Sequence, residues 1–162
     1  MTRTKKATLI SLSILLTLST LTGCGAKSVS NDATATNPTV SGAAGSKPVI
    51  GAPEGAAPTT LVTNDIIVGT GKEAVATSTL TVHYTLMAWS TGQVVESSWD
   101  GGSPATFPLS GVIAGWQEGL PGTKVGGRRL LVIPPSLGYG PSAGHPLEKE
   151  TLIFTVDIIA VS

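Results

Sequence analysis

Few side chains in this 162-residue chain are of the types that carry out acid–base, nucleophilic or metal chemistry. The chain has two histidines, His83 and His145, and a single cysteine, Cys24, and its carboxylates are not grouped. Two separated histidines without clustered carboxylates or thiolates do not predict a metal site. No serine lies in a G-x-S-x-G context that would present it as a nucleophile. The sequence therefore predicts neither a metal nor a cofactor.

Two further ligand classes are also disfavoured. Gly69-Thr70-Gly71-Lys72 superficially resembles a phosphate-binding loop, but the first glycine of that motif is missing and no Ser or Thr follows Lys72. The ten basic and ten acidic residues of the whole chain balance. Without the first six positions, which hold Arg3, Lys5 and Lys6, seven basic residues oppose ten acidic ones, a net charge of about −3. That balance predicts no nucleic-acid partner, because binding phosphates requires a basic patch.

The side chains that remain are aromatic, and they favour a binding pocket. Tyr84, Trp116, Tyr139 and Phe154 are spread along the second half of the chain. If these side chains converge in the fold, they form a concave apolar site with a few polar hydroxyls, which suits a ligand. Spacing alone leaves a second interpretation open, in which Trp116 is simply a core residue.

The stretch Val112–Leu120 must position Trp116, and its sequence predicts a short helix. Gly115 and Gly119 flank the tryptophan, and Pro121-Gly122 ends the segment. A helix this short is marginal alone and must be held by packing. Its apolar residues recur at roughly helical spacing, so one face can lie on a sheet; they are Val112, Ile113, Trp116 and Leu120.

The segments around this helix have the patterns of short strands joined by glycine and proline turns. Residues 79–89 alternate, with Leu80, Val82, Tyr84, Leu86 and Ala88 on one apolar face and polar residues on the other. Further strands are expected at 94–98, 107–109, 128–133 and 151–161. Antiparallel strands packed on a single short helix predict an α+β domain with a bent sheet of five to six strands.

The N-terminal segment 1–23 has the layout of a secretory signal peptide, with positive charges followed by an apolar stretch shorter than the roughly 20 residues of a bilayer span. Leu21-Thr22-Gly23-Cys24 resembles the bacterial lipobox, in which the cysteine is lipidated. We therefore expect an exported lipoprotein, held on the extracytoplasmic face of a membrane through Cys24. The alternative is an ordinary cleaved signal followed by an incidental cysteine.

The segment 24–60, beginning at Cys24, is dominated by Ala, Gly, Ser, Thr, Pro and Asn and has no aromatic residue. Such a composition buries too little surface to offset its ordering entropy, so it predicts a flexible linker. A coil of that length reaches about 30–36 Å. The folded domain is expected to span 61–162.

Several motifs in this domain, taken in order, resemble the FKBP-type peptidyl-prolyl isomerases. They are Val82-His83-Tyr84-Thr85, Glu96-Ser97-Ser98, Val112 to Leu120, Gly138-Tyr139-Gly140 and Thr151-Leu152-Ile153-Phe154. The resemblance implies a half-barrel of antiparallel strands wrapped on one short helix. It also implies cis/trans isomerisation of X-Pro bonds, with proline-containing polypeptides as clients and macrolide immunosuppressants as further ligands.

The resemblance also implies the residues of the site. The catalytic group comprises Tyr84, Ile113, Trp116, Tyr139 and Phe154. The substrate-binding group comprises Val95, Glu96, Val112, His145 and Leu147. In this scheme Trp116 forms the floor beneath the proline ring, while the Tyr139 hydroxyl and the Ile113 backbone N–H bind substrate carbonyls.

Some positions depart from the common pattern of the family. Val95 stands where a pocket Phe is usual and Glu96 where an Asp is usual, and Gly101 and Ala105 replace an Arg and another aromatic. The loop after His145 is shortened, which leaves Leu147 as its apolar candidate. A thinner wall predicts an active but weaker isomerase. The alternative is a binding or chaperone module that uses the same pocket with little turnover.

Overall fold

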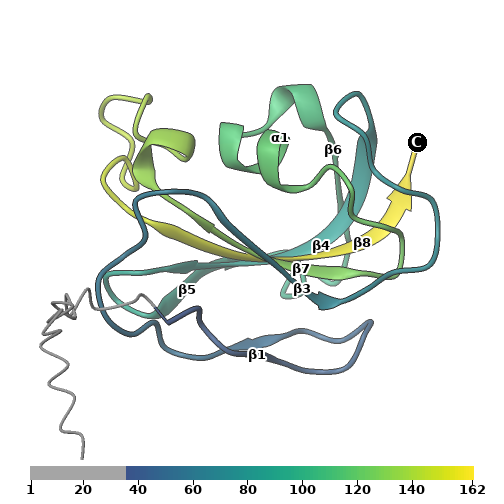
Figure 1. Cartoon of the computed structure of the whole chain (residues 1–162), viewed down its shortest axis with the longest axis horizontal. Helices are drawn as coiled ribbons and strands as arrows, with labels where there is room; N and C mark the ends of the chain where they lie inside the picture. Colours follow the sequence, from purple (N-terminus) through teal and green to yellow (C-terminus); the bar gives the residue numbers. More distant parts are fainter. Residues whose placement is uncertain (1–35) are drawn as a thin grey trace, which may run out of the picture. The chain divides into compact units, whose positions relative to one another are not determined.

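The computed structural model describes residues 36–162, which belong to one compact unit, Asn31–Ser162. Its centre is an antiparallel sheet of six strands (Figure 1). Five of the strands lie in the order β3 (Val62–Ile67), β7 (Arg128–Ile133), β8 (Leu152–Val161), β4 (Thr79–Ala88) and β5 (Gln93–Ser97), and β6 (Ala105–Pro108) also pairs with β4. The predicted α+β fold with a bent antiparallel sheet is confirmed.

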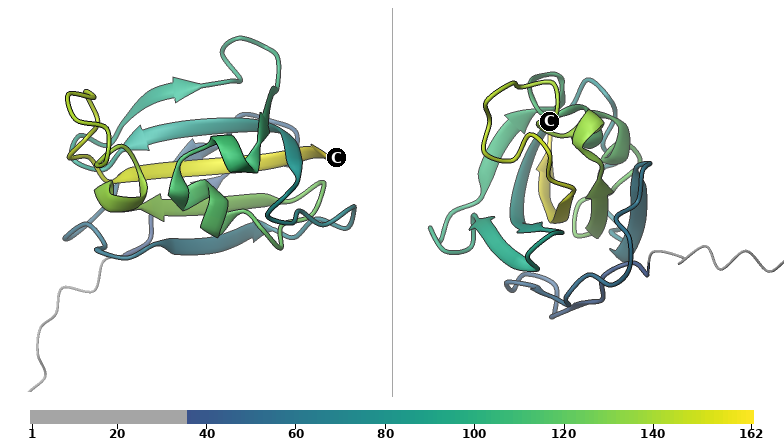
Figure 2. Two further views of the ribbon diagram at one scale, coloured as in Figure 1. Left: turned by 90° about the horizontal axis from the view of Figure 1, so that it is seen from above. Right: turned by 90° about the vertical axis from the view of Figure 1, so that its left-hand side faces the viewer.

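Helix α1 (Ala114–Gly119) lies on one face of the sheet, and we call this face the helix face (Figure 2). The helix lies close to β7 because Gly115 lacks a side chain: an added Cβ would lie 2.5 Å from Ile133 Cγ2. A short 3-10 helix, Leu109–Gly111, precedes α1 in the chain, and a second one, Pro135–Leu137, follows β7. The short helix predicted around Trp116 is therefore present, within the expected stretch.

The main core fills the space between α1 and the helix face. Alternate residues of β4 and β8 point into it, which matches the predicted apolar face of β4 and follows from the period of two in a strand. Its buried members include Leu80, Val82, Leu86, Trp116, Leu131, Ile133, Leu152, Phe154, Val156 and Ile158.

The opposite face of the sheet is covered by residues 36–60, which we call the N-terminal strap (Figure 1). The strap contains a small hairpin of β1 (Val40–Ser41) and β2 (Val49–Ile50). Ile50, 8% exposed, packs with Met87, Leu130, Val132 and Ile153 of the sheet. The prediction of a flexible linker over 24–60 is therefore wrong for residues 36–60, because the sheet supplies the apolar surface that the strap lacks by itself.

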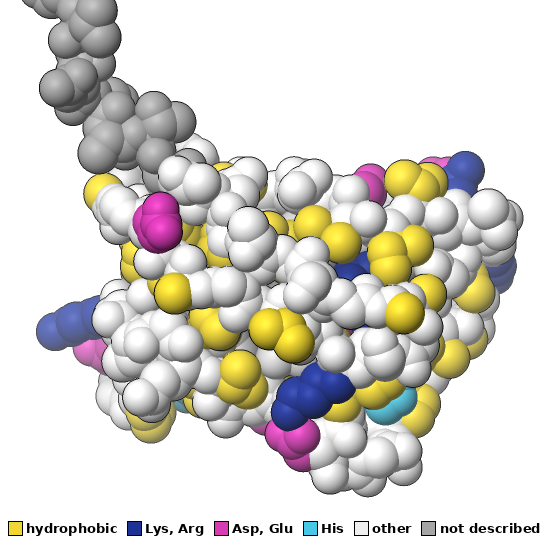
Figure 3. Space-filling view, turned by 90° about the horizontal axis from the view of Figure 1, so that it is seen from below, with side chains coloured by type: hydrophobic (Ala, Val, Ile, Leu, Met, Phe, Trp, Pro, Cys, Tyr) yellow, Lys and Arg dark blue, Asp and Glu magenta, His cyan; other side chains and the backbone are white. Residues whose placement is uncertain are grey.

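The strap also changes the environment of the predicted polar face of β4, where Thr85 and Met87 are buried. Seen from outside, the strap side of the molecule presents scattered hydrophobic side chains and few charged ones (Figure 3). The predicted signal peptide 1–23, Cys24 and residues 25–35 lie outside the described residues. Within residues 36–162, no helix is long and apolar enough to cross a membrane.

A buried ion pair fastens the strap to the sheet. The Arg128 Nε donates to both carboxylate oxygens of Asp157, at 2.9 and 3.0 Å. Its Nη1 donates to the Gly42 carbonyl at 3.1 Å and its Nη2 to the Ser46 carbonyl at 2.6 Å. Burial raises the pKa of Asp157, and the guanidinium opposes that rise. Arg128 is 1% exposed, so the whole guanidinium is buried between the strap and the sheet.

Candidate functional site

A cavity of about 310 Å³ opens between α1, the concave side of β4 and β5, and the loops around them. Its walls are mainly aromatic and aliphatic, with a single carboxylate at the edge. The lining residues are Tyr84, Leu86, Glu96, Phe107, Gly111, Val112, Ile113, Trp116, Tyr139 and Phe154. The structure therefore brings together most of the predicted site residues, from five separate segments of the chain.

Trp116 lies at the centre of these aromatic rings. Its indole makes edge contacts with Tyr84, Phe107 and Phe154, at centroid distances of 5.8, 5.9 and 5.3 Å. Edge-to-face packing at these distances is favourable for aromatic rings and fixes their orientation. Trp116 is only 4% exposed, so it is both a core residue and a lining residue of the cavity, and the two interpretations of its spacing are compatible.

Phe107 is a lining residue that sequence reasoning did not identify. It lies on β6, where it pairs with Leu80 of β4, and its ring contacts both Trp116 and Tyr84. Leu80 is buried on the helix face, so a residue in register with it on a neighbouring strand has its side chain on the same face. The available signal was the pairing register, which cannot be read from one strand alone.

The polar groups of the cavity are two phenols and one carboxylate. The Tyr84 hydroxyl donates to Glu96 Oε1 at 2.5 Å. Burial, together with the adjacent Glu96, raises the pKa of Tyr84 and the pKa of Tyr139 above the usual value of 10. Both phenols are therefore neutral hydrogen-bond donors at ordinary pH. No hydrogen bond of the Tyr139 hydroxyl is found among residues 36–162, so this donor faces the cavity without a protein partner.

The N-terminus of α1 adds a main-chain donor. Ile113 is the residue before the helix, and its carbonyl accepts hydrogen bonds from the N–H groups of Trp116 and Gln117. The Gln117 side chain donates to the Val112 carbonyl at 2.7 Å, which fixes the turn into the helix. In the described part of the chain no acceptor is found for the Ile113 N–H, as expected for the first amides of a helix.

Three predicted substrate-binding residues do not line the cavity. Val95 is 49% exposed, and a register shift between β4 and β5 pairs Glu96 with Leu86 but Val94 with Met87, which leaves Val95 as the extra residue of a bulge. His145 stacks on Tyr139 at 3.9 Å, and its Nδ1 accepts the Leu147 N–H at 3.1 Å. Leu147 packs against the core from the same loop. His145 and Leu147 thus support the loop of Tyr139.

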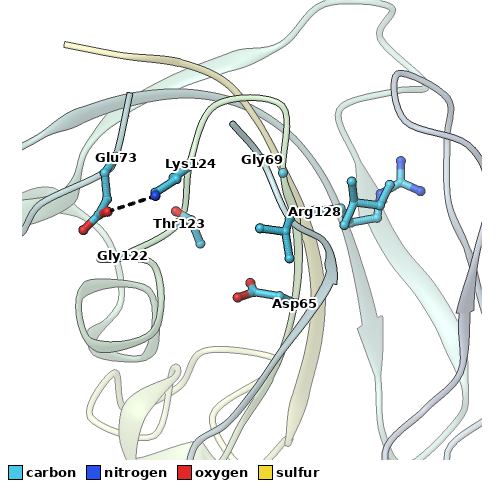
Figure 4. A pocket seen from close by; sticks show the side chains of 10 residues that line it. Asp65, Gly69, Glu73, Gly122, Thr123, Lys124 and Arg128 are labelled. Carbon is cyan, nitrogen blue, oxygen red and sulfur yellow. Dashed lines mark ion pairs between the residues drawn. The ribbon is translucent and has the colours of Figure 1, made fainter. Parts of the chain in front are cut away.

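A second cavity, of about 250 Å³, lies between the end of β3 and the loops 68–73 and 122–127 (Figure 4). An ion pair joins Lys124 to Glu73 at 3.7 Å, and the Arg128 side chain extends away from the cavity. Gly69 is needed for packing, because an added Cβ would lie 2.3 Å from the Lys124 carbonyl oxygen. The glycines that resembled a phosphate loop are therefore structural. No group of three or more potential metal ligands occurs among residues 36–162.

Comparison with known proteins gives one consistent result. The sequence profile of the FKBP-type peptidyl-prolyl cis-trans isomerases matches residues 71–159. A probable FK506-binding protein from Corynebacterium glutamicum is 54% identical over 115 residues, which cover 70% of this chain and 98% of the relative. An FK506-binding protein from Streptomyces anulatus is 44% identical over 120 residues, covering 71% of this chain and 97% of the relative.

Solved structures agree with the sequence matches. FkpA from Escherichia coli has a TM-score of 0.58 and 38% identity, and the match covers 63% of this chain and 48% of FkpA. AtFKBP13 has a TM-score of 0.56 and 32% identity over 65% of this chain and 96% of that protein. The chain therefore spans about half of FkpA but nearly all of the smaller relatives.

Proposed function

This chain belongs to the FKBP-type peptidyl-prolyl cis-trans isomerases, and we propose that its aromatic cavity is the site where the X-Pro bonds of exported polypeptides are isomerised. The observation that carries this proposal is the cluster of Trp116, Tyr84 and Phe154, with ring centroids 5.3 to 6.3 Å apart, beside two neutral phenols. The cavity offers apolar surface and hydrogen-bond donors. Within the described residues it contains no nucleophile paired with a base.

The chemistry of the reaction suits such a site. Rotation about an X-Pro bond meets a barrier of about 18–20 kcal/mol, because the twisted amide loses its resonance. No covalent bond is broken, so no acid or nucleophile is needed. The twisted amide has less charge separation than the planar one, and a dry apolar cavity therefore favours it. Each 1.4 kcal/mol of such differential binding raises the rate about tenfold.

We assign the residues as follows. Trp116 supports the proline ring, and Tyr84, Phe107 and Phe154 enclose it. The Tyr139 hydroxyl and the Ile113 N–H donate to the carbonyls on either side of the proline. Glu96 holds the Tyr84 phenol at the edge of the cavity. His145 and Leu147 act on the client through the loop that carries Tyr139, and Val95 contacts client residues outside the cavity.

A peptide isomerisation assay tests this assignment. Wild type is compared with Trp116→Ala and Tyr139→Ala on a short X-Pro peptide, in a protease-coupled or exchange format. We expect both variants to lose most of the rate enhancement. Trp89→Ala is the matched control, because this tryptophan packs on the strap side of the sheet. A wild-type rate equal to that of buffer would contradict the isomerase site and leave a module that binds clients with little turnover.

Macrolides of the FK506 type are proposed as competing ligands. The support is the likeness to relatives named FK506-binding proteins, together with an apolar cavity of about 310 Å³. FK506 should inhibit the isomerisation in proportion to its occupancy of the cavity, and Trp116→Ala should weaken the binding of FK506, measured by calorimetry. Undiminished activity at saturating FK506 would remove this ligand class.

The proposed location is the extracytoplasmic face of a membrane, with Cys24 as the lipidated residue. The support is the sequence Leu21-Thr22-Gly23-Cys24 after an apolar segment. Residues 25–35 separate Cys24 from the strap, and eleven residues span at most about 40 Å. Labelling with a fatty-acid probe should mark the wild type but not Cys24→Ala. Absence of label in the wild type would favour the ordinary signal with an incidental cysteine.

A further inference from the structure

One stretch of β4 lacks a partner strand on the side away from β8. There, β6 pairs with Thr79–Val82 and β5 pairs with Thr85–Ala88, so His83 and Tyr84 face the opening between the two short strands. On its other side β4 pairs with β8 at both positions. Main-chain N–H and C=O groups in such an opening need other hydrogen-bond partners.

Ser98, the residue after the end of β5, supplies these partners. Its hydroxyl accepts the Tyr84 N–H at 2.8 Å, and its own N–H donates to the Tyr84 carbonyl at 3.0 Å. The neighbouring Ser97 hydroxyl also donates to that carbonyl, at 3.2 Å. Ser98 thus acts in place of a strand residue at the point where the β4 edge is open, and it binds both polar groups of the Tyr84 main chain.

Ser98 is itself held from the strap side of β4. The His83 Nδ1 lies 3.0 Å from the Ser98 hydroxyl. The His83 ring stacks on Trp99, with centroids 3.9 Å apart and planes inclined by 16°. Because the imidazole is fixed by this stacking, the hydroxyl has a defined position between His83 and Tyr84. The Ser98 side chain therefore links a stacked pair outside the cavity to a residue that lines it.

Tyr84 is the residue through which this link reaches the site. Its ring contacts Trp116, Phe107 and Phe154, and its hydroxyl binds Glu96. A shift of its main chain moves all of these contacts together. We infer that Ser98 is a positioning residue, which sets the Tyr84 ring against Trp116 and the phenol against Glu96. This inference rests on the proposed function of the cavity.

Kinetics on a short X-Pro peptide provide the first test. Ser98→Ala should lower kcat/KM about tenfold, roughly the effect of one lost hydrogen bond, while Ser98→Thr, which keeps the hydroxyl, should stay near wild type. Ser103→Ala is the matched control, because Ser103 is exposed in the loop that follows β5. In a Tyr84→Leu background Ser98→Ala should have little further effect, because the ring on which Ser98 acts is gone.

Two results would overturn the inference. One is a loss from Ser98→Ala that is equally large with and without the Tyr84 ring. The other is a lower melting temperature while kcat/KM, measured well below melting, stays at the wild-type value. Either result would reduce Ser98 to a residue that stabilises the loop.

The second test does not depend on catalysis, so it separates this inference from the proposed function. The chain contains two tyrosines, and their ring resonances can be assigned with a Tyr139→Phe variant. Ser98→Ala should shift the Tyr84 ring resonances, and Ser98→Thr should restore them. Unchanged Tyr84 resonances in Ser98→Ala would refute the positioning role, whether or not the wild type isomerises the peptide.

Discussion

Replacement of Arg128 by methionine tests how the strap is held on the sheet. The guanidinium is buried between Asp157 and the carbonyls of Gly42 and Ser46, so Arg128→Met keeps most of the side-chain volume while removing all of these hydrogen bonds. The Asp157 carboxylate then remains buried without its cation. Breaking a buried pair from one side costs about 3–5 kcal/mol. We expect a loss of that size in the free energy of unfolding, measured with urea at pH 8.

The pH dependence of this loss identifies its cause. Burial raises the pKa of Asp157, and Arg128→Met removes the guanidinium that opposes this rise. A carboxyl whose folded pKa lies above its unfolded value makes the folded state bind more protons, so stability falls as pH rises through the folded pKa. The defect of Arg128→Met should therefore be smaller at pH 5 than at pH 8.

A second substitution provides the control. Arg128→Met/Asp157→Leu removes both charges, and an apolar pair of similar volume commonly replaces a buried ion pair without loss. The double variant should recover most of the stability. Amide exchange at Gly42 to Ser46 should nevertheless stay faster than in the wild type, because the guanidinium N–H groups that bind the strap carbonyls are gone. The reasoning fails if the double variant is as unstable as the single one, or if the defect of Arg128→Met does not change with pH.

Three further predictions concern the helix and the cavity. Gly115→Ala should destabilise the domain by about 1–3 kcal/mol in urea unfolding through overpacking against β7, whereas Gly101→Ala, whose added Cβ meets nothing closer than 3.7 Å, should not. Phe107→Ala should lower kcat/KM about tenfold through lost aromatic contacts, while Val95→Ala, outside the cavity, should leave short-peptide activity near wild type. Because burial raises the pKa of both cavity phenols, kcat/KM should not fall between about pH 8 and 9; a fall above pH 8 that Tyr139→Phe abolishes would contradict this.

Much of the fold was accessible from the sequence because its signals are local. The glycines around Trp116 and the proline after the helix limit α1 to a short segment. The period-two pattern of β4 indicates which side chains share a face with Tyr84. The convergence of Trp116, Tyr84, Tyr139 and Phe154 came from the family resemblance rather than from spacing, since no local pattern brings residues so distant in sequence together.

What the sequence did not reveal depends on partners distant in the chain. The strap has a composition typical of a linker, and its order comes from a sheet face and a guanidinium more than 80 residues away. Phe107 enters the cavity through the pairing of β6 with β4, and Val95 leaves the alternation through a bulge in β5. A bulge and a register are properties of two strands together, so neither one has a signature in a single strand.

The strap makes the two faces of the domain different: the strap covers one face, which we call the back, and the cavity opens on the other. The chain crosses the sheet on the face opposite α1, and the aromatic cavity opens on the α1 side (Figure 1). A support, fusion partner or surface joined ahead of residue 36 is therefore attached at the back of the domain. Under the proposed function, immobilisation through the N-terminus should therefore cost little in the access of proline-containing clients to the cavity.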